Sequence, residues 1–332
     1  MASSPVKVSV IIPIYNAGKI LGRMLDSLLA QTEQSFEVIC VDDGSSDDGA
    51  TDKVLSEYVA KDSRIHVLHQ KNQGAAVARN LGLQNAQGKY VYVCDQDDYC
   101  HRELLSYCLW VAESYNVPFV AFRYGHLRGG ESVNTDSLIQ YGKIPIAVAD
   151  ENNAKQDVAT YRKAHCFHTD CWVQFTTTEL ARTFPFALDR GLTRPFTLLK
   201  AAKRWAVSEA VLYFYNPDVA TSMMHKPIQE KVLLAERSDM IAFWELYKEE
   251  RDSGDELGIW QMQCKNLLIN GLKQELNAIR REKRMTGHKA SKEKWVILAE
   301  TVRELLKNRR IPIRYVKCRH LLHYLWLMQK YQ

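Results

Sequence analysis

The chain has 332 residues, of which 46% are apolar and 25% are charged, with a formal net charge of +5. This composition is typical of a globular protein with one large domain or two. No apolar run approaches the roughly 20 residues needed to cross a bilayer, and the N-terminus lacks the charged flank and apolar core of a secretion signal. These features argue against a membrane-spanning or secreted protein and favour the cytoplasm.

The eight cysteines are scattered along the chain, several of them within apolar segments. Their placement indicates buried free thiols in a reducing compartment and argues against a disulfide framework. The charge is distributed unevenly. Residues 280–332 contain fifteen Lys or Arg and four Glu, a formal +11, so that the first 279 residues carry about −6. A basic C-terminal region on an acidic body suggests an anionic partner for that region.

Over the first ~120 residues, apolar β-rich segments alternate with segments of helical periodicity. We expect strands at 6–14, 36–41, 65–69, 90–94 and 117–122, and helices at 20–31, 49–60, 75–85 and 101–114. The strands are too apolar for a sheet with one solvated face. The pattern therefore predicts an α/β fold with a doubly wound, mostly parallel sheet and right-handed crossovers.

The rest of the chain is less regular. Residues 123–160 are poorly patterned, and we expect them to be rich in loops. Helical character returns over 180–202, a strand is expected at 206–215, and from 228 onward the chain is almost entirely helical, with a charged linker at 280–294. These changes suggest three parts, listed in chain order as 1–122, 123–225 and 226–332.

Three carboxylates directly follow the strand expected at 90–94: Asp95, Asp97 and Asp98. Like charges this close repel each other unless a cation lies between them. Mg²⁺ and Mn²⁺ prefer oxygen ligands and commonly bridge carboxylates to phosphates. A solvated acidic turn that begins a helix is the alternative, because Asp is also a good N-cap.

Polar groups follow other strands of the expected sheet as well: Tyr15 and Asn16 after the first, Asp42 and Asp43 after the second. In doubly wound sheets ligands bind at the carboxyl ends of the strands. The chain has neither a Gly-x-Gly-x-x-Gly segment after the first strand nor a phosphate-binding P-loop, which disfavours dinucleotide binding and P-loop hydrolysis. Bound phosphates would then need a metal ion to neutralise them, which gives more weight to the acidic strand end.

Five segments resemble, in order and spacing, the family-2-type nucleotide-sugar glycosyltransferases of the A-type, Rossmann-like fold. They are Val8-Ser-Val-Ile-Ile-Pro-Ile-Tyr-Asn16, Val41-Asp-Asp-Gly-Ser45, Asn72-Gln-Gly74 with Ala78-Arg-Asn80, Gly88-Lys-Tyr90, and Asp95-Gln-Asp-Asp98. The match covers residues 6–120. A looser similarity continues through Trp172 to Tyr215, and none extends beyond about residue 225.

The resemblance implies a nucleotide-sugar donor, usually UDP-linked, over the strand ends. Tyr15 beside Pro13 would stack on the base, Asp42 would accept the base N–H, and Asp95 with Asp97 would hold Mn²⁺ or Mg²⁺ on the diphosphate. Asp98 would cap or support this turn rather than bind the metal. The remaining expected donor-site residues are Asn16, Gly74, Arg79 and Gln96. Each also has a structural interpretation, such as a turn aromatic for Tyr15, a helix cap for Asp42 and a surface charge for Arg79.

An inverting transfer needs a general base for the acceptor hydroxyl. In the family this is usually an Asp within a Glu-Asp pair, but this chain has Leu192-Thr193 near that place, and Asp189 is the nearest carboxylate. Asp189 is therefore the candidate catalytic base, although a turn or cap role fits it equally. The missing Glu-Asp pair leaves a second hypothesis open, namely a catalytically impaired nucleotide-sugar-binding protein that acts as a scaffold or regulator.

The resemblance implies a glycan or lipid-linked glycan acceptor, as in bacterial surface polysaccharide synthesis. His168 and Asp170 lie in a Cys- and His-containing stretch whose spacing does not match paired zinc knuckles, so an acceptor-pocket role is favoured over zinc. The basic C-terminal region could lie on anionic lipid as a peripheral contact with the inner face of the membrane, or it could simply expose cations from packed helices. Nucleic acid is disfavoured, because the body is acidic and no nucleic-acid-reading motif is present.

Overall fold

A computed structural model describes residues 5–127, 138–150, 171–186, 194–216 and 259–308, together with isolated positions between 227 and 245 and between 326 and 330. The chain forms two compact units. One consists of residues 1–188 and 194–219, and the other of residues 189–193 and 220–332.

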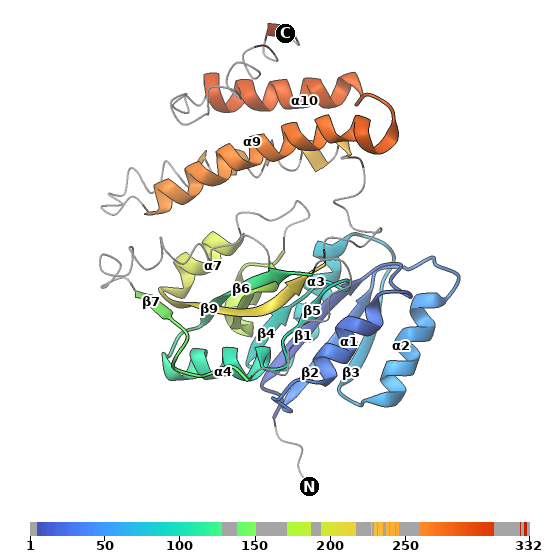
Figure 1. Ribbon diagram of the computed structural model, residues 1–332, viewed down its shortest axis with the longest axis vertical. Coiled ribbons are helices and arrows are strands. Elements are labelled where there is room, and N and C mark those ends of the chain that lie inside the picture. The colour runs from blue at the N-terminus through green and yellow to red at the C-terminus, as the bar shows by residue number, and fades with distance from the viewer. Residues whose placement is uncertain are drawn as a thin grey trace. The chain divides into compact units, whose positions relative to one another are not determined.

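The first unit begins with the expected strict alternation of strands and helices (Figure 1). All of the strands and helices expected up to residue 94 are present, with bounds shifted by three residues at most. They are β1 (Val8–Ile14), α1 (Leu21–Leu29), β2 (Phe36–Asp42), α2 (Ala50–Lys61), β3 (Ile65–His69), α3 (Ala75–Asn85) and β4 (Tyr90–Val93). Every residue of β1, β2 and β4 is buried, as expected for strands with helices on both faces.

Alternate residues of β1 belong to different layers of the core. Val8, Val10 and Ile12 pack with residues of α1, whereas Ile11 packs with Leu83 of α3 on the opposite face. Gly82 allows α3 to lie directly on β1, because a Cβ at this position would come within 2.5 Å of the Ile11 Cγ2. The apolar character of β1 on both faces thus follows from its place between two helical layers.

In the part of the chain that the structure describes, the sheet has nine strands in the order β3-β2-β1-β4-β8-β6-β9-β5, with β7 paired to β9. The pairs β1–β2, β2–β3, β1–β4 and β6–β9 are parallel, and β8 runs antiparallel between β4 and β6. The predicted doubly wound, mostly parallel architecture is confirmed. The remaining elements of this unit are β5 (Tyr99–Cys100), α4 (Leu104–Ser114), β6 (Phe119–His126), β7 (Ile146–Asp150), β8 (Gln174–Thr177), α6 (Thr178–Thr183), α7 (Arg194–Ala202) and β9 (Arg204–Tyr215).

The middle of the chain differs in part from the expectations. Residues 123–160 were expected to be loop-rich; in the part that the structure describes, 123–127 and 138–150, residues 123–126 and 146–150 are strand, because β6 and β7 both pair along β9. Tertiary pairing here overrides weak local patterning. The helical stretch expected over 180–202 is interrupted, since α6 ends at Thr183 and the non-helical Phe184 precedes Pro185, which disfavours helix at the residue before it.

The second unit is helical among its described residues. The helix α9 (Ile259–Thr286) and the helix α10 (Lys292–Val302) run antiparallel, and a π-helical turn η3 (Arg303–Asn308) follows α10 (Figure 1). Much of the expected linker 280–294 is therefore helix, and Glu282 of α9 pairs with Lys294 of α10 at 2.8 Å. No helix in the described part of the chain is both long and apolar enough to span a membrane. The five cysteines that the structure describes are free thiols, as predicted.

Candidate functional site

The candidate site lies at the end of β1, which has β2 on one side and β4 on the other. The chain continues from β1 to β2 and β3 on the first side and returns to pair β4 on the second. This reversal of strand order is the topological switch point at which open α/β sheets bind ligands. The β1–β4 pairing ends at Ile11 and Val93, whereas the β1–β2 pairing continues to Ile14 and Asp42. After the end of β4, Cys94 N donates a hydrogen bond to the carbonyl of Ile11 in β1. Pro13, two residues on, faces the same side and has no N–H to donate there.

The residues after β1 and β4 are tied together by one side chain. The Gln96 amide accepts from Tyr15 N at 2.8 Å and donates to Tyr15 O at 3.2 Å. The Tyr15 residue remains 42% exposed. Gln96, expected at the donor site, thus has its amide engaged with the backbone, and it fixes the turn that presents the Tyr15 ring.

Asp42 lies at the end of β2 with its carboxylate almost fully buried. Its Oδ1 accepts from Ser45 N at 3.1 Å and from the Ser45 hydroxyl, and its Oδ2 lies 3.3 Å from His69 Nδ1 at the end of β3. Ser45 also accepts from Asn16 N at 2.9 Å, and Asn16 Oδ1 in turn accepts from Ser46 N at 2.7 Å. Asn16 has a φ of 51°, a conformation that Asn tolerates better than most residues. Asn16 and Asp42 therefore belong to one network that joins the ends of β1, β2 and β3.

Asp43 was not singled out for a role from the sequence, yet it organises the turn before α3. Its buried carboxylate accepts from Gln70 Nε2 at 2.6 Å and from the N–H groups of Gln73 and Gly74 at 2.8 Å each. Gly74 has a φ of +94°, which favours glycine at this position. The signal in the sequence was the pair of segments Asp42-Asp43-Gly44 and Asn72-Gln73-Gly74, which are distant along the chain.

Arg79 projects from α3 to the acidic strand end after β4. Its Nη2 donates to Asp95 Oδ1 at 2.8 Å, and its guanidinium lies 5.6 Å from the Phe186 ring centroid. The buried Nε of Arg79 has no hydrogen-bond partner among the described residues. Arg79 is thus not a surface charge, and it places a fixed cation beside Asp95.

The three acids of the strand end have different environments. Burial and the charge of Asp95 raise the pKa of Asp97 to about 6. Burial and the charges of Asp95 and Asp97 raise the pKa of Asp98 to about 8, although hydrogen bonds from Tyr213 and Asn216 oppose this rise. The Tyr213 hydroxyl donates to Asp98 Oδ2, and Asn216 N donates to Asp98 Oδ1 at 2.8 Å.

Each oxygen of Asp98 therefore accepts a hydrogen bond inside the protein, which is compatible with the supporting role expected for it. Tyr213 also accepts from Asp95 N at 3.2 Å, so this tyrosine of β9 holds the acidic turn at two points. No local pattern predicts this contact, because Tyr213 lies 118 positions after Asp95.

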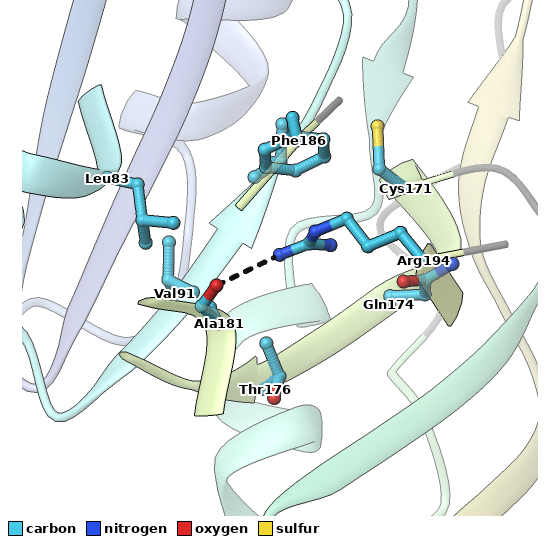
Figure 2. Close-up of a pocket in the computed structure, with 9 residues that line it drawn as sticks. Leu83, Val91, Cys171, Gln174, Thr176, Ala181, Phe186 and Arg194 are labelled. Carbon is cyan, nitrogen blue, oxygen red and sulfur yellow. Dashed lines mark hydrogen bonds between the residues drawn. The ribbon is translucent and has the colours of Figure 1, made fainter. Parts of the chain in front are cut away.

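A small cavity lies beside this region, between α3, β4, β8 and α6. Figure 2 shows the Arg194 guanidinium reaching toward the carbonyl of Ala181, with Phe186 and Cys171 nearby. Arg194 also stacks on Phe186 at 3.8 Å and donates to Phe184 O at 2.7 Å. Burial lowers the pKa of Arg194 to about 10, with the nearby Arg79 adding to the effect. At about 10 Å³ the cavity has room for one water molecule, not for a sugar or a nucleotide.

Three residues considered for catalysis or for the acceptor pocket lie outside the residues that the structure describes. Asp189, the candidate base, and His168 with Asp170 lie outside the described residues. Within the described part of the chain, the one group of three side chains close enough to share a metal ion is Asp42, Asp52 and His69. This group lies after β2 and β3, away from the predicted metal pair Asp95 and Asp97, and its members form an internal contact between His69 and Asp42.

Comparison with known proteins adds independent information. The model of glycosyl transferase family 2 matches residues 9–177. An uncharacterized glycosyltransferase of Rickettsia felis is 42% identical over 113 residues, which is 34% of this chain but only 18% of that relative's length. The uncharacterized glycosyltransferase EpsJ of Bacillus subtilis is 27% identical over 252 residues, covering 72% of this chain and 70% of EpsJ.

Among solved structures, residues 1–349 of TarS from S. aureus, in complex with UDP-GlcNAc, have a similar fold. The TM-score is 0.64 at 19% sequence identity, and the match covers 98% of this chain and 88% of the TarS chain. At this level of identity the likeness concerns the fold, including the helical C-terminal region.

Proposed function

Because this chain belongs to glycosyl transferase family 2, we propose that it transfers a sugar from a nucleotide-sugar donor, UDP-linked in the first instance, to a glycan or lipid-linked glycan acceptor. The observation that carries the proposal is the convergence of Tyr15, Asp42, Arg79 and the acidic turn on adjacent strand ends around one switch point. The complex of TarS with UDP-GlcNAc supports the choice of a UDP-linked donor. The similar proteins of Rickettsia felis and Bacillus subtilis are named glycosyltransferases, and surface polysaccharide synthesis is the setting that we propose.

Each side chain has a chemical role in this proposal. The exposed ring of Tyr15 stacks on the base. The Asp42 carboxylate accepts the base N–H, which selects uracil over cytosine, because cytosine presents an acceptor at that position. Gly74 brings the backbone at the start of α3 close to the donor without a Cβ in the way, and Arg79 adds positive charge near the diphosphate.

Asp95 and Asp97 fit a divalent cation. Asp97 is partly exposed, and its pKa is raised by burial and by the charge of Asp95. No cationic partner of Asp97 is found among the described residues. Arg79 engages only Oδ1 of Asp95, which leaves the second oxygen for a ligand. Bound Mn²⁺ or Mg²⁺ would stabilise the negative charge of the leaving nucleoside diphosphate. Asp98, with both oxygens occupied, keeps the turn in shape and does not serve as a ligand.

We assign proton acceptance from the acceptor hydroxyl to Asp189, the nearest carboxylate to the place of the family's usual base, in an inverting reaction. The test is release of UDP from a panel of UDP-sugars with Mn²⁺, with and without candidate acceptors. Wild-type protein should release UDP, and Asp189→Asn and Asp97→Ala should each abolish the release. UDP binding without turnover for every donor and acceptor would instead favour the scaffold or regulator hypothesis.

A lipid-linked acceptor would bring the protein to a membrane surface, and the basic C-terminal region suits anionic lipid. Replacing Arg309, Arg310, Arg314 and Lys317 by Gln should weaken binding to phosphatidylglycerol vesicles and leave UDP affinity unchanged. Vesicle binding equal to that of the wild type would remove this part of the proposal.

A further inference from the structure

His69, at the end of β3, contacts the Asp42 carboxylate, which we assign to recognition of the uracil base. His69 Nδ1 lies 3.3 Å from Asp42 Oδ2, with 61% of the His69 side chain exposed and 7% of the Asp42 side chain exposed. The donor-site residues expected from the sequence did not include His69. The contact joins a solvent-accessible ring to a nearly buried acid.

The two oxygens of Asp42 are held from different segments. Ser45 supplies two donors to Oδ1, and His69 is the partner that the structure describes for Oδ2. Ser45 itself is fixed by Asn16 after β1. The plane of the carboxylate is thus set by the ends of three strands, and His69 sets it on the side of β3.

The chemistry of this contact has one direction. A carboxylate oxygen accepts hydrogen bonds, so in this contact Nδ1–H of His69 donates the hydrogen bond and Asp42 Oδ2 accepts it. Asp52 in the first turn of α2 lies near the same ring, since its carboxylate, Asp42 and His69 offer atoms within 4.8 Å of one another. A second carboxylate therefore lies near the His69 ring, and the contact that holds Nδ1 is the one with Asp42.

We propose that His69 is a positioning residue for base recognition: by holding Oδ2 of Asp42, it aims the remaining lone pair of this oxygen at the imide N–H of uracil. The proposal rests on the proposed function, because it assumes that Asp42 receives the base. Without His69 the carboxylate is held only through Oδ1. The affinity for uracil nucleotides should then fall. The affinity for cytosine nucleotides should not change, because cytosine has no N–H at that position to donate to Asp42.

The chain provides a matched control on the same strand. His66 also lies on β3, its side chain is 52% exposed, and its Nε2 lies 4.0 Å from a carboxylate of β2, that of Glu37. Glu37 is at the opposite end of β2 from Asp42. His66→Ala therefore removes a similar ring and a similar pair without touching the proposed site.

The experiment is calorimetric titration of UDP and of CDP, each with Mn²⁺, into the full chain and its variants. His69→Ala should weaken UDP binding about five- to tenfold, the effect of one well-placed hydrogen bond, and leave CDP binding within twofold. His69→Asn, whose amide N–H takes the place of Nδ1–H, should restore most of the UDP affinity. His66→Ala should change neither ligand, and thermal melting should show both alanine variants folded.

Several results overturn the proposal. Unchanged UDP affinity in His69→Ala, or equal weakening of UDP and CDP, means that His69 does not act through the base. If the wild type binds UDP and CDP equally, Asp42 does not read the base, and this proposal fails while donor binding stands. No binding of any nucleotide by the wild type overturns the proposed function as well. If Mn²⁺ alone binds and both His69→Ala and Asp52→Asn abolish that binding without changing the UDP to CDP ratio, the three side chains form a metal site instead.

Discussion

Tyr213 of β9 offers the sharpest test of how the acidic turn is held. Its ring is fully buried and stacks on Trp172 with centroids 4.7 Å apart. Its hydroxyl donates to Asp98 and accepts from Asp95 N. Tyr213→Phe keeps the ring and its stacking and removes only these two hydrogen bonds. The buried Asp98 then loses one of its two donors, and the N–H of Asp95 loses its acceptor.

The expected cost follows from these contacts. Leaving a buried polar group unpaired costs about 1–3 kcal/mol, and Tyr213→Phe removes one partner from each of two groups, Asp98 and Asp95 N. We expect Tyr213→Phe to lower the free energy of unfolding by about 2–3 kcal/mol. Tyr92→Phe is the matched control, because Tyr92 is equally buried and its hydroxyl donates to Trp172 O at 2.9 Å, away from the acidic turn. Loss of that neutral bond should cost about 1 kcal/mol.

Urea unfolding followed by circular dichroism measures both losses, and titration of UDP with Mn²⁺ measures the site. Tyr213→Phe should be the less stable variant and should bind UDP and Mn²⁺ more weakly, whereas Tyr92→Phe should keep wild-type affinity. Equal stability losses, or wild-type metal and UDP binding in a destabilised Tyr213→Phe, would refute the argument that this hydroxyl shapes the acidic turn.

Three further predictions follow from the described contacts. Gly82→Ala should lower the free energy of unfolding by about 1–3 kcal/mol, because the added Cβ meets Ile11. Combined with Ile11→Ala in a double-mutant cycle, it should lower the free energy by less than the sum of the two single effects. An additive result would contradict the close packing. Asp43→Ala should destabilise the protein by about 2–3 kcal/mol and weaken UDP binding, with urea unfolding and titration as measurements; an unchanged affinity would separate this turn from the site. The raised pKa values of Asp97 and Asp98 mean that, between about pH 4 and about pH 8, the folded state holds protons that the unfolded chain has released. Without metal, the free energy of unfolding should therefore fall as the pH rises from about 4 to about 8. Urea unfolding in EDTA across this range measures the slope, which Asp98→Asn should flatten.

The sequence predicted the first half of the fold because local patterns and tertiary contacts agree there. Strands β1, β2 and β4 are largely apolar on both faces because helices cover both faces. The buried Ser9 and Glu37 are exceptions within β1 and β2, and they hydrogen-bond to each other. The side chains after β1, β2 and β4 could be placed at one edge of the sheet by the rules of parallel topology alone.

Contacts between distant segments could not be predicted in the same way. Nothing near Tyr213 indicates that its hydroxyl meets Asp95 and Asp98, and nothing near His69 indicates that it faces Asp42. The strand β7 forms because β9 offers an edge, not because its own pattern is strong. Periodicity reports which face of an element is buried, but the identity of the partner depends on how the whole chain folds.

The central claim is that the strand ends after β1, β2, β3 and β4 bind a nucleotide-sugar donor. Backbone hydrogen exchange with and without UDP and Mn²⁺ tests it most directly, because it reports the location of binding on the full chain. We predict slower exchange in residues 13–18, 42–47, 72–79 and 94–98, and unchanged exchange in α10. Protection confined to other segments, or no protection at saturating UDP and Mn²⁺, would contradict the account.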